Sequence, residues 1–348
     1  MKNYLIVLLL LAASIVNANE CQVSPPELAL YYGNGMFNSQ KAARESRNSL
    51  IRLMRNQLPG YRINYKLSYN YNENPVDQVL EVARQKLLQD YSNFLLWLSG
   101  LELAPDWFRE GLELIVTSYD AFSYLFDSDL RRHISQYTQD INQCRKVLLV
   151  AHSQGNFYGN ESWRSVYQTS TAGIAWNELK LMGMVSVATP ASQVGYPLSY
   201  PVDQQSVTRY LTLSDDLVIN LLRSAAFGPL PANVTNSTVS DDWKNHSFGM
   251  SYVLGDSSGQ LLKDQIRSVA YSLETLPFDR QPVDSSALAS AGYDPTARIL
   301  EIEFVGSDSL YRYYDVPESV YQDLLSADSV GRYYNLAIRG QYPSRRLN

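Results

Sequence analysis

The chain has 348 residues, of which 45% are hydrophobic and 18% charged, and its formal net charge is -6. This composition is typical of a globular protein and excludes a largely disordered or low-complexity chain. The negative charge argues against nucleic acid or an anionic membrane as a partner, because binding to either depends on a positive field. The length allows one large core together with a small second module, or two ordinary domains.

The N-terminus has the pattern of a secretory signal. Lys2 supplies a positive charge, residues 5–13 are apolar but too few to span a bilayer, and Ala18 is a small residue at which a signal peptidase would cut. We therefore expect residues 1–18 to be removed, giving a secreted or periplasmic protein without a stable membrane span. A short membrane anchor is the alternative.

The chain contains two cysteines, Cys21 and Cys144, and both lie after the expected cleavage point. In an oxidising compartment an isolated pair is more often a disulfide than two free thiols. The sequence therefore predicts a disulfide that ties the mature N-terminus to the region just before the strand at 147–152.

Strand and helix patterns alternate through residues 19–276. In chain order we expect a strand with a two-glycine turn over 25–36, a helix over 39–57, a strand over 61–72, a helix over 130–141, a strand over 147–152, a helix to about 168, strands over 181–188 and 207–213, and a helix over 261–273. This alternation predicts an α/β fold whose mostly parallel sheet has helices on both faces.

Residues of about 74–126 interrupt that alternation with helical patterns. Asn74 and Pro75 make a helix start, with asparagine at the cap and proline at the first helical position. The segment is either a cap over a site or a set of additional core helices, and the pattern favours neither.

The chain changes character after residue 276. Residues 277–285 form a polar linker with two prolines, and residues 286–348 have two strand patterns followed by a helix. We expect a separate small α+β module there.

The stretch "VLLVAHSQGN" over 147–156 is the strongest chemical signal. A buried strand leads into Ser153, and small residues stand at Ala151 and Gly155, as in a nucleophile elbow. A serine hydroxyl needs a base within hydrogen-bond reach and a third group that orients the base.

The chain offers three histidines as that base. His152 is adjacent to Ser153, and His133 lies on an earlier helix, so both are expected to be structural. His246 lies downstream of every expected core strand of the sheet, where a loop can present it as the general base.

The acid is expected between the serine and the histidine in the chain. "TLSDDLV" follows the strand over 207–213, so its carboxylates would emerge at the carboxyl end of the sheet. Asp215 is the first choice and Asp216 the alternative. The pair could also cap the next helix, since aspartate is a good cap.

Two backbone N–H groups are candidates for an oxyanion hole. One belongs to Gln154, at the start of the helix after Ser153. The other belongs to Met36, in the turn where Gly33 and Gly35 let the backbone approach a substrate. An ordinary glycine turn after a strand is the alternative for this segment.

Taken together, "YYGNGM", "VLLVAHSQGN", "TLSDDLV" and "WKNHSF" resemble the α/β-hydrolase superfamily over roughly residues 25–276. The resemblance implies a serine esterase, lipase or related hydrolase with Ser153, Asp215 and His246 as its triad. Ala151 replaces the commoner first glycine of the elbow, and Asn34 stands before Gly35 where the superfamily usually has histidine.

The C-terminal motifs "SALASAGYDPTARILEIEF", "YRYYDVP" and "ADSVGRYYNLAIRGQY" resemble the KTSC domain, which also occurs at the end of some lysyl-tRNA synthetases. From residue 286 onward the chain has six arginines and no lysine against eight acidic residues. That balance is unfavourable for phosphate binding. We expect a packing role or a contact with a protein partner through 286–348.

The chain lacks a phosphate-binding loop and a dinucleotide-binding glycine motif, and it has too few histidines and cysteines for a zinc site. No metal and no cofactor are therefore expected. The resulting hypothesis is an exported hydrolase that cleaves a small acyl-ester or lipid-like substrate. Thioester and amide substrates remain open. The competing hypothesis is a secreted, non-catalytic binding or scaffold protein that interacts through its KTSC-like module.

Overall fold

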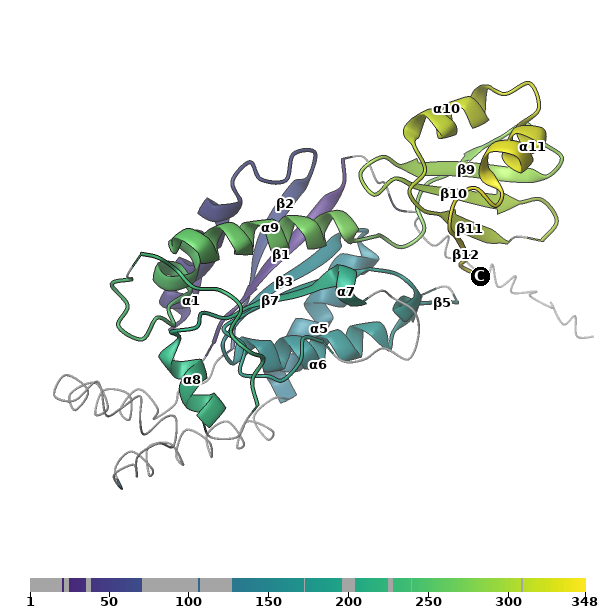
Figure 1. Cartoon of the computed structure of the whole chain (residues 1–348). Coiled ribbons are helices and arrows are strands. Elements are labelled where there is room, and N and C mark those ends of the chain that lie inside the picture. Colours follow the sequence, from purple (N-terminus) through teal and green to yellow (C-terminus); the bar gives the residue numbers. More distant parts are fainter. Residues whose placement is uncertain are drawn as a thin grey trace, which may run out of the picture.

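The computed structural model describes residues 21, 25–35, 39–70, 106, 127–171, 173–195, 204–224, 228–238, 240–307 and 309–348 (Figure 1). The expected signal at 1–18, almost all of the helical segment at 74–126, and Met36 lie outside the described residues. No helix in the described ranges is long and apolar enough to cross a membrane.

The larger sheet has five parallel strands in the order β2-β1-β3-β6-β7. In chain order they are β1 (Glu27–Gly33), β2 (Arg62–Ser68), β3 (Lys146–His152), β6 (Met182–Val187) and β7 (Thr208–Leu211). Every residue of β3 and β6 is buried. Strands buried on both faces read as continuous apolar runs, which is why these two were recognisable in the sequence.

Helices cover both faces of this sheet (Figure 1). On one face lie α5 (Asp127–Asn142) and α6 (Gly155–Tyr167), and on the other lie α1 (Gln40–Met54) and α9 (Asp256–Ser272). The side chain of Ser39 caps α1 by accepting a hydrogen bond from the N–H of Ala42. The arrangement confirms the predicted α/β fold.

The chain around β7 differs from the expectation of one strand over 207–213. Residues of α7 (Gln204–Val207) are helical, and a second helix, α8 (Leu217–Ser224), follows β7. Asp216 caps α8 through a hydrogen bond of 3.0 Å from the N–H of Ile219 to its Oδ1. The carboxylate therefore starts a helix, as the capping alternative for this pair of aspartates expected.

Shorter elements complete the larger unit. They are β4 (Ser170–Thr171), β5 (Ile174–Ala175), the 3-10 helix η2 (Trp176–Glu178) and the π-helix η3 (Phe248–Val253). η3 begins immediately after the loop that carries His246, and it packs against α1 and α9.

The C-terminal residues form a second, antiparallel sheet in the order β12-β11-β10-β9-β8. The strands are β8 (Gln281–Pro282), β9 (Leu288–Asp294), β10 (Ile299–Phe304), β11 (Leu310–Tyr313) and β12 (Ser344–Arg346). The helices α10 (Glu318–Ser326), α11 (Val330–Tyr333) and η4 (Tyr334–Ile338) pack on one face and enclose a separate small core.

The other face of the small sheet is charged and buried against the larger unit. Arg312 of β11 donates to Glu301 of β10 at 3.0 Å and to Glu274 at 2.7 Å, and it is fully buried. Lys146, the first residue of β3, lies 3.3 Å from Asp294 of β9, with both side chains buried. The C-terminal module therefore contacts the amino end of β3, and Ser153 follows the other end.

The predicted disulfide between Cys21 and Cys144 is present. Cys21 also pairs through its backbone with the segment that leads to the small sheet, donating to Pro277 and accepting from Asp279. The bridge thus links the N-terminal segment, the entrance to β3 and this connecting segment.

Candidate active site

Ser153 occupies a strained turn between β3 and α6. Its φ angle is 54°, in the left-handed region that residues other than glycine rarely adopt. A hydrogen bond of 3.0 Å from its own N–H to the carbonyl of Val187 at the end of β6 fixes the turn. This is the backbone geometry expected of an elbow that presents a serine at the top of a parallel sheet.

The turn after β1 packs directly against this elbow. A Cβ atom at Gly155 would lie 2.7 Å from the carbonyl oxygen of Asn34, and one at Gly35 would lie 2.6 Å from the Cβ of Ser153. Neither position has room for a side chain. The glycines predicted to matter here therefore do so because two backbone segments approach each other.

The imidazole of His246 lies between Ser153 and Asp216. Nε2 is 3.0 Å from Ser153 Oγ, and Nδ1 is 3.0 and 2.9 Å from the two carboxylate oxygens of Asp216. These three residues are far apart in the sequence, and they come from the end of β3, the loop after β7 and the loop before η3. Asp216 is fully buried, and Ser153 is 3% exposed.

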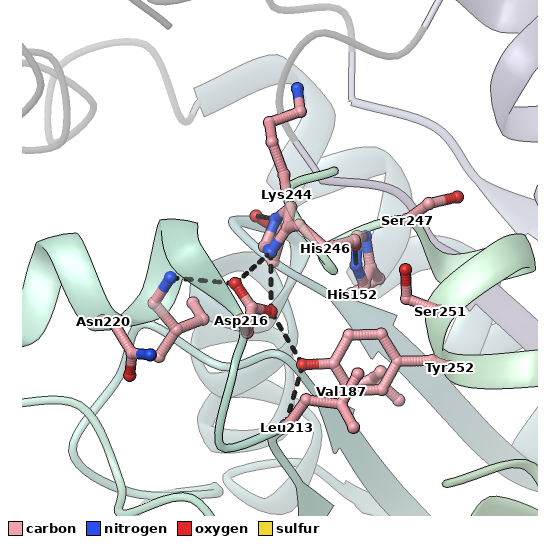
Figure 2. Close-up of polar contacts among 12 residues, drawn as sticks. His152, Val187, Leu213, Asp216, Asn220, Lys244, His246, Ser247, Ser251 and Tyr252 are labelled. Carbon is pink, nitrogen blue, oxygen red and sulfur yellow. Dashed lines mark hydrogen bonds and ion pairs between the residues drawn. The ribbon is translucent and has the colours of Figure 1, made fainter. Parts of the chain in front are cut away.

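Asp216 accepts further hydrogen bonds besides that of His246. The hydroxyl of Tyr252 donates to Oδ2 at 2.7 Å (Figure 2). The N–H of Ile219 donates to Oδ1 at 3.0 Å. A buried carboxylate requires such partners, because an unpaired charge in the interior is costly. Its donors hold it in one orientation against the imidazole.

Asp215, the first choice from the sequence, is not the carboxylate at His246. Its side chain is exposed and accepts a hydrogen bond of 3.0 Å from Asn245. The structure brings Asp216 into that place, because the residue that caps α8 points inward and its neighbour points to solvent. The alternative that the pair caps a helix is also correct for Asp216.

The other two histidines contact backbone carbonyl groups. His133 Nε2 lies 3.3 Å from the carbonyl of Tyr69, and His152 Nε2 lies 2.8 Å from the carbonyl of His246. Burial, reinforced by the nearby Arg132, lowers the pKa of His133 to about 4. Burial also lowers the pKa of His152 well below its usual value, with His246 acting in the same direction.

Of the two predicted oxyanion donors, only Gln154 lies in the described part of the chain. It precedes the first residue of α6, and no described residue accepts a hydrogen bond from its N–H. The two polar atoms of its side chain are likewise buried without a partner among the described residues. Met36 lies outside the described residues.

The turn before Met36 is fixed by two asparagines. Asn70 donates through its N–H to Asn34 Oδ1 at 2.9 Å and through Nδ2 to the carbonyl of Asn34 at 2.7 Å. Asn34 Nδ2 also donates to the carbonyl of Gly35 at 2.9 Å. Both asparagines are almost fully buried. Asn70, just after β2, therefore fixes the position of the turn that approaches Ser153.

The position of these residues follows from the strand order. After β1 the chain first adds β2 on one side and then β3 on the other, so the connections leave the carboxyl ends of β1 and β3 in opposite directions. In open α/β sheets, ligands bind at such a switch point. Asn34, at the end of β1, and Ser153, at the end of β3, lie there side by side.

Several residues at the site were not singled out by the sequence. They are Asp242, which accepts from the N–H of His246, and Tyr252, which donates to Asp216. Asn70 is a third, and it donates to Asn34 in the turn beside Ser153. "DDWKNHS" does contain an aspartate four residues before His246, a spacing that suits a carboxylate accepting from a following turn. The other two contacts arise from tertiary packing and leave no local pattern. Within the described ranges, no group of three or more His, Cys, Asp or Glu side chains is placed to hold a metal ion.

Away from this site, the C-terminal unit is an antiparallel sheet with short helices on one face, which defines a small α+β domain. Its residues 284–342 match the KTSC domain family. This C-terminal domain therefore belongs to the KTSC family, as its motifs indicated.

Individual proteins also resemble this part of the chain. A protein from Tsukamurella paurometabola is 47% identical over 62 residues, which are 18% of this chain and 91% of that protein. A crystal structure of a KTSC domain protein from Yersinia pestis is 43% identical, covering 20% of this chain and 97% of its own, with a TM-score of 0.20. A lysine–tRNA ligase from a Nostoc species is 32% identical over 75 residues, only 13% of the ligase.

Proposed function

We propose that the chain is a serine hydrolase that cleaves an ester or a related acyl bond through an acyl-Ser153 intermediate. The observation that carries the proposal is the continuous set of hydrogen bonds from Ser153 Oγ to His246 Nε2 at 3.0 Å and from His246 Nδ1 to Asp216 at 2.9 Å. A nucleophile, a base and an orienting acid in this geometry are what acyl transfer by a serine requires.

Each residue has one role in the reaction. Asp216 accepts a hydrogen bond from Nδ1–H of His246, which keeps the proton on Nδ1 and leaves the Nε2 lone pair free to take the proton of Ser153 Oγ as the oxygen attacks the carbonyl carbon. The C–O or equivalent bond to the leaving group then breaks, and His246 returns the proton to that group. Water repeats the sequence, with His246 as its base, and releases the acid and free Ser153.

The N–H of Gln154 supports the same reaction as an oxyanion donor. It stands at the start of α6, immediately after the nucleophile, and no described residue uses it. A donor fixed in advance stabilises the charge that develops on the carbonyl oxygen without reorganisation. The Met36 N–H is the second proposed donor, and the superfamily assignment to the α/β-hydrolases is part of the same proposal.

The substrate class and the setting follow from chemistry and the sequence. We infer a small acyl-ester or lipid-like substrate, and thioesters and amides use the same groups. The disulfide supports an oxidising compartment, as do the signal-like features of residues 1–18, so the protein is proposed to be secreted or periplasmic. The KTSC domain is proposed to serve packing or protein contact.

A fluorophosphonate probe and a panel of p-nitrophenyl esters test the proposal on the full chain. The wild type should be labelled and should hydrolyse short esters, whereas Ser153→Ala should lose labelling and at least about 10⁴-fold in kcat, as other serine hydrolases do. Ser214→Ala serves as the control, because Ser214 is exposed and directly precedes Asp215 in the sequence. This variant should behave as wild type. An unlabelled wild type would favour the non-catalytic binding protein instead.

A further inference from the structure

The main chain of His246 is held on both sides by buried side chains. Its N–H donates to Asp242 Oδ2 at 2.7 Å, and its carbonyl oxygen lies 2.8 Å from His152 Nε2. Asp242 is 8% and His152 4% exposed. These hydrogen bonds go to the main chain of His246 rather than to Ser153 Oγ or the Asp216 carboxylate, so neither side chain belongs to the reacting groups proposed above.

Asp242 organises the whole loop that carries His246. Besides His246, its Oδ2 accepts from the N–H of Ser247 at 2.6 Å and from the hydroxyl of Ser251 at 3.0 Å, and its Oδ1 accepts from the N–H of Lys244 at 3.3 Å. Burial alone raises the pKa of Asp242, but the hydrogen bonds from Ser247, His246 and Ser251 outweigh it and lower that pKa. Asp242 is therefore ionised, and its carboxylate accepts hydrogen bonds from several residues of a loop that has no regular secondary structure.

His152 connects this loop to the nucleophile. Because its Nε2 faces a carbonyl oxygen, Nε2 must carry the proton, and Nδ1 has no hydrogen-bond partner in the described part of the chain. The imidazole packs against the rings of His246 and Tyr252, with centroids 4.9 and 6.1 Å away (Figure 2). The ring of Phe248 also packs on it, with its centroid 5.7 Å away. As the immediate neighbour of Ser153, it ties the strand end to the histidine loop.

The groups that could change the charge around His152 come from each element packed on it. They are His246 and Asp242 of the loop, Asp216 before α8, and Tyr252 of η3. Asp216 and Asp242 are both tied to hydrogen-bond donors, and the hydroxyl of Tyr252 is itself a donor to Asp216. Burial, with His246 acting in the same direction, lowers the pKa of His152 and keeps its imidazole neutral, and the carbonyl of His246 fixes its single proton on Nε2.

We propose that Asp242 and His152 are positioning residues that set the imidazole of His246 at hydrogen-bond distance from both Ser153 and Asp216. The inference rests on the proposed hydrolase function and extends it to the loop. Without Asp242, three N–H groups of the loop lose their acceptor. Without His152, the loop loses its direct hydrogen bond to the strand that carries the nucleophile. A shift of about 1 Å in a catalytic group is enough to cost on the order of 100-fold in rate.

Four variants of the full chain test the proposal. Asp242→Ala and His152→Phe remove the contacts, whereas Asp242→Asn and His152→Gln keep an acceptor or a donor at the same place. We expect the first two to lower kcat by about 10- to 100-fold with KM within about 2-fold of wild type, and the second two to recover most of kcat. Thermal unfolding of all four shows whether each variant is folded at the assay temperature.

Hydrogen exchange over residues 242–252 gives a readout that does not depend on turnover. Asp242→Ala and His152→Phe should lose protection there, and the two conservative variants should keep it. A kcat of wild-type size in Asp242→Ala and His152→Phe would overturn the inference, as would an equal loss in all four. If the fluorophosphonate probe fails to label wild type, the hydrolase proposal fails. Hydrogen exchange still tests the positioning role in that case, and unchanged protection in both Asp242→Ala and His152→Phe would overturn it.

Discussion

The hydroxyl of Tyr252 donates a hydrogen bond of 2.7 Å to the carboxylate of Asp216, on the same Oδ2 atom that lies 2.9 Å from His246 Nδ1. The same hydroxyl accepts the N–H of Leu213 at 3.1 Å. Burial, together with the charge of Asp216, raises the pKa of Tyr252 well above its usual value. Tyr252 therefore stays a donor and holds Asp216 to the end of β7.

Asp216 and Asp215 form a matched pair for mutation, since both changes to asparagine remove one charge from adjacent positions. Asp216→Asn should lower kcat by about 10³- to 10⁴-fold, because the amide favours the wrong tautomer of His246. Asp215→Asn should stay within about 3-fold of wild type, since its carboxylate is exposed and its hydrogen bond is to Asn245 rather than to His246. Ester hydrolysis measures both, and a larger loss in Asp215→Asn would contradict the assignment.

Arg312 should be essential for the stability of the contact between the KTSC domain and the larger unit. Arg312→Met removes the buried ion-pair partner of Glu274 and one of the two arginines that pair with Glu301, the other being Arg280, and should lower the free energy of unfolding by about 3–5 kcal/mol. Arg332→Met changes an exposed arginine of the same domain and should cost less than about 0.5 kcal/mol. Urea unfolding monitored by fluorescence compares them, and equal midpoints would show that the ion pairs contribute nothing.

The Cys21–Cys144 disulfide joins residues 123 positions apart. By the chain-entropy model, replacing both cysteines with serine should lower the free energy of unfolding by up to about 4–5 kcal/mol. Adding a reductant should lower the melting temperature of wild type toward that of the double variant and leave the double variant unchanged. Alkylation of unreduced wild type checks the bridge itself, since two added alkyl groups would mean free thiols.

His133 should make stability depend on pH. Its pKa falls from 6.5 to about 4 on folding, so between these values the unfolded chain binds a proton that the native protein does not. Stability should therefore be fully present above pH 6.5 and fall as the pH drops toward 4, by up to about 3 kcal/mol.

His133→Gln keeps a donor for the carbonyl of Tyr69 but does not titrate in this range. Its free energy of unfolding should vary less between pH 7.5 and 4.5 than that of wild type. His152, whose pKa is also lowered by burial, contributes with the same sign and remains in both proteins. Parallel pH dependences of the two proteins would rule out the assigned contribution of His133.

The sequence predicts best where one periodic pattern decides a structure. β3 and β6 are continuous apolar runs, and the small residues around Ser153 indicate the elbow. Both follow from local sterics and burial. The choice between Asp215 and Asp216 depends on one residue of register at the start of α8. That register is set by the capping hydrogen bond to Ile219 and by contacts with His246, which lies 30 positions away.

Other features were hidden because their partners are backbone groups or distant charges. Asp242 acts by accepting N–H groups in an irregular loop, which leaves no periodic signal. Charged residues on a strand usually face solvent, yet Glu301 and Arg312 of the small sheet are both fully buried. Each compensates the other, which a count of charges along one strand does not reveal.

Because of the buried ions at the KTSC contact, the final packing of the larger unit depends on residues that are synthesised later. Lys146 and Glu274 are translated well before Asp294 and Arg312, the residues that neutralise them. A nascent chain that ends between them must leave both charges hydrated, so water stays at the amino end of the parallel sheet. The larger unit therefore reaches its final packing only after residues 294–312 have been synthesised, and a chain that stops before them would keep water around Lys146 and Glu274.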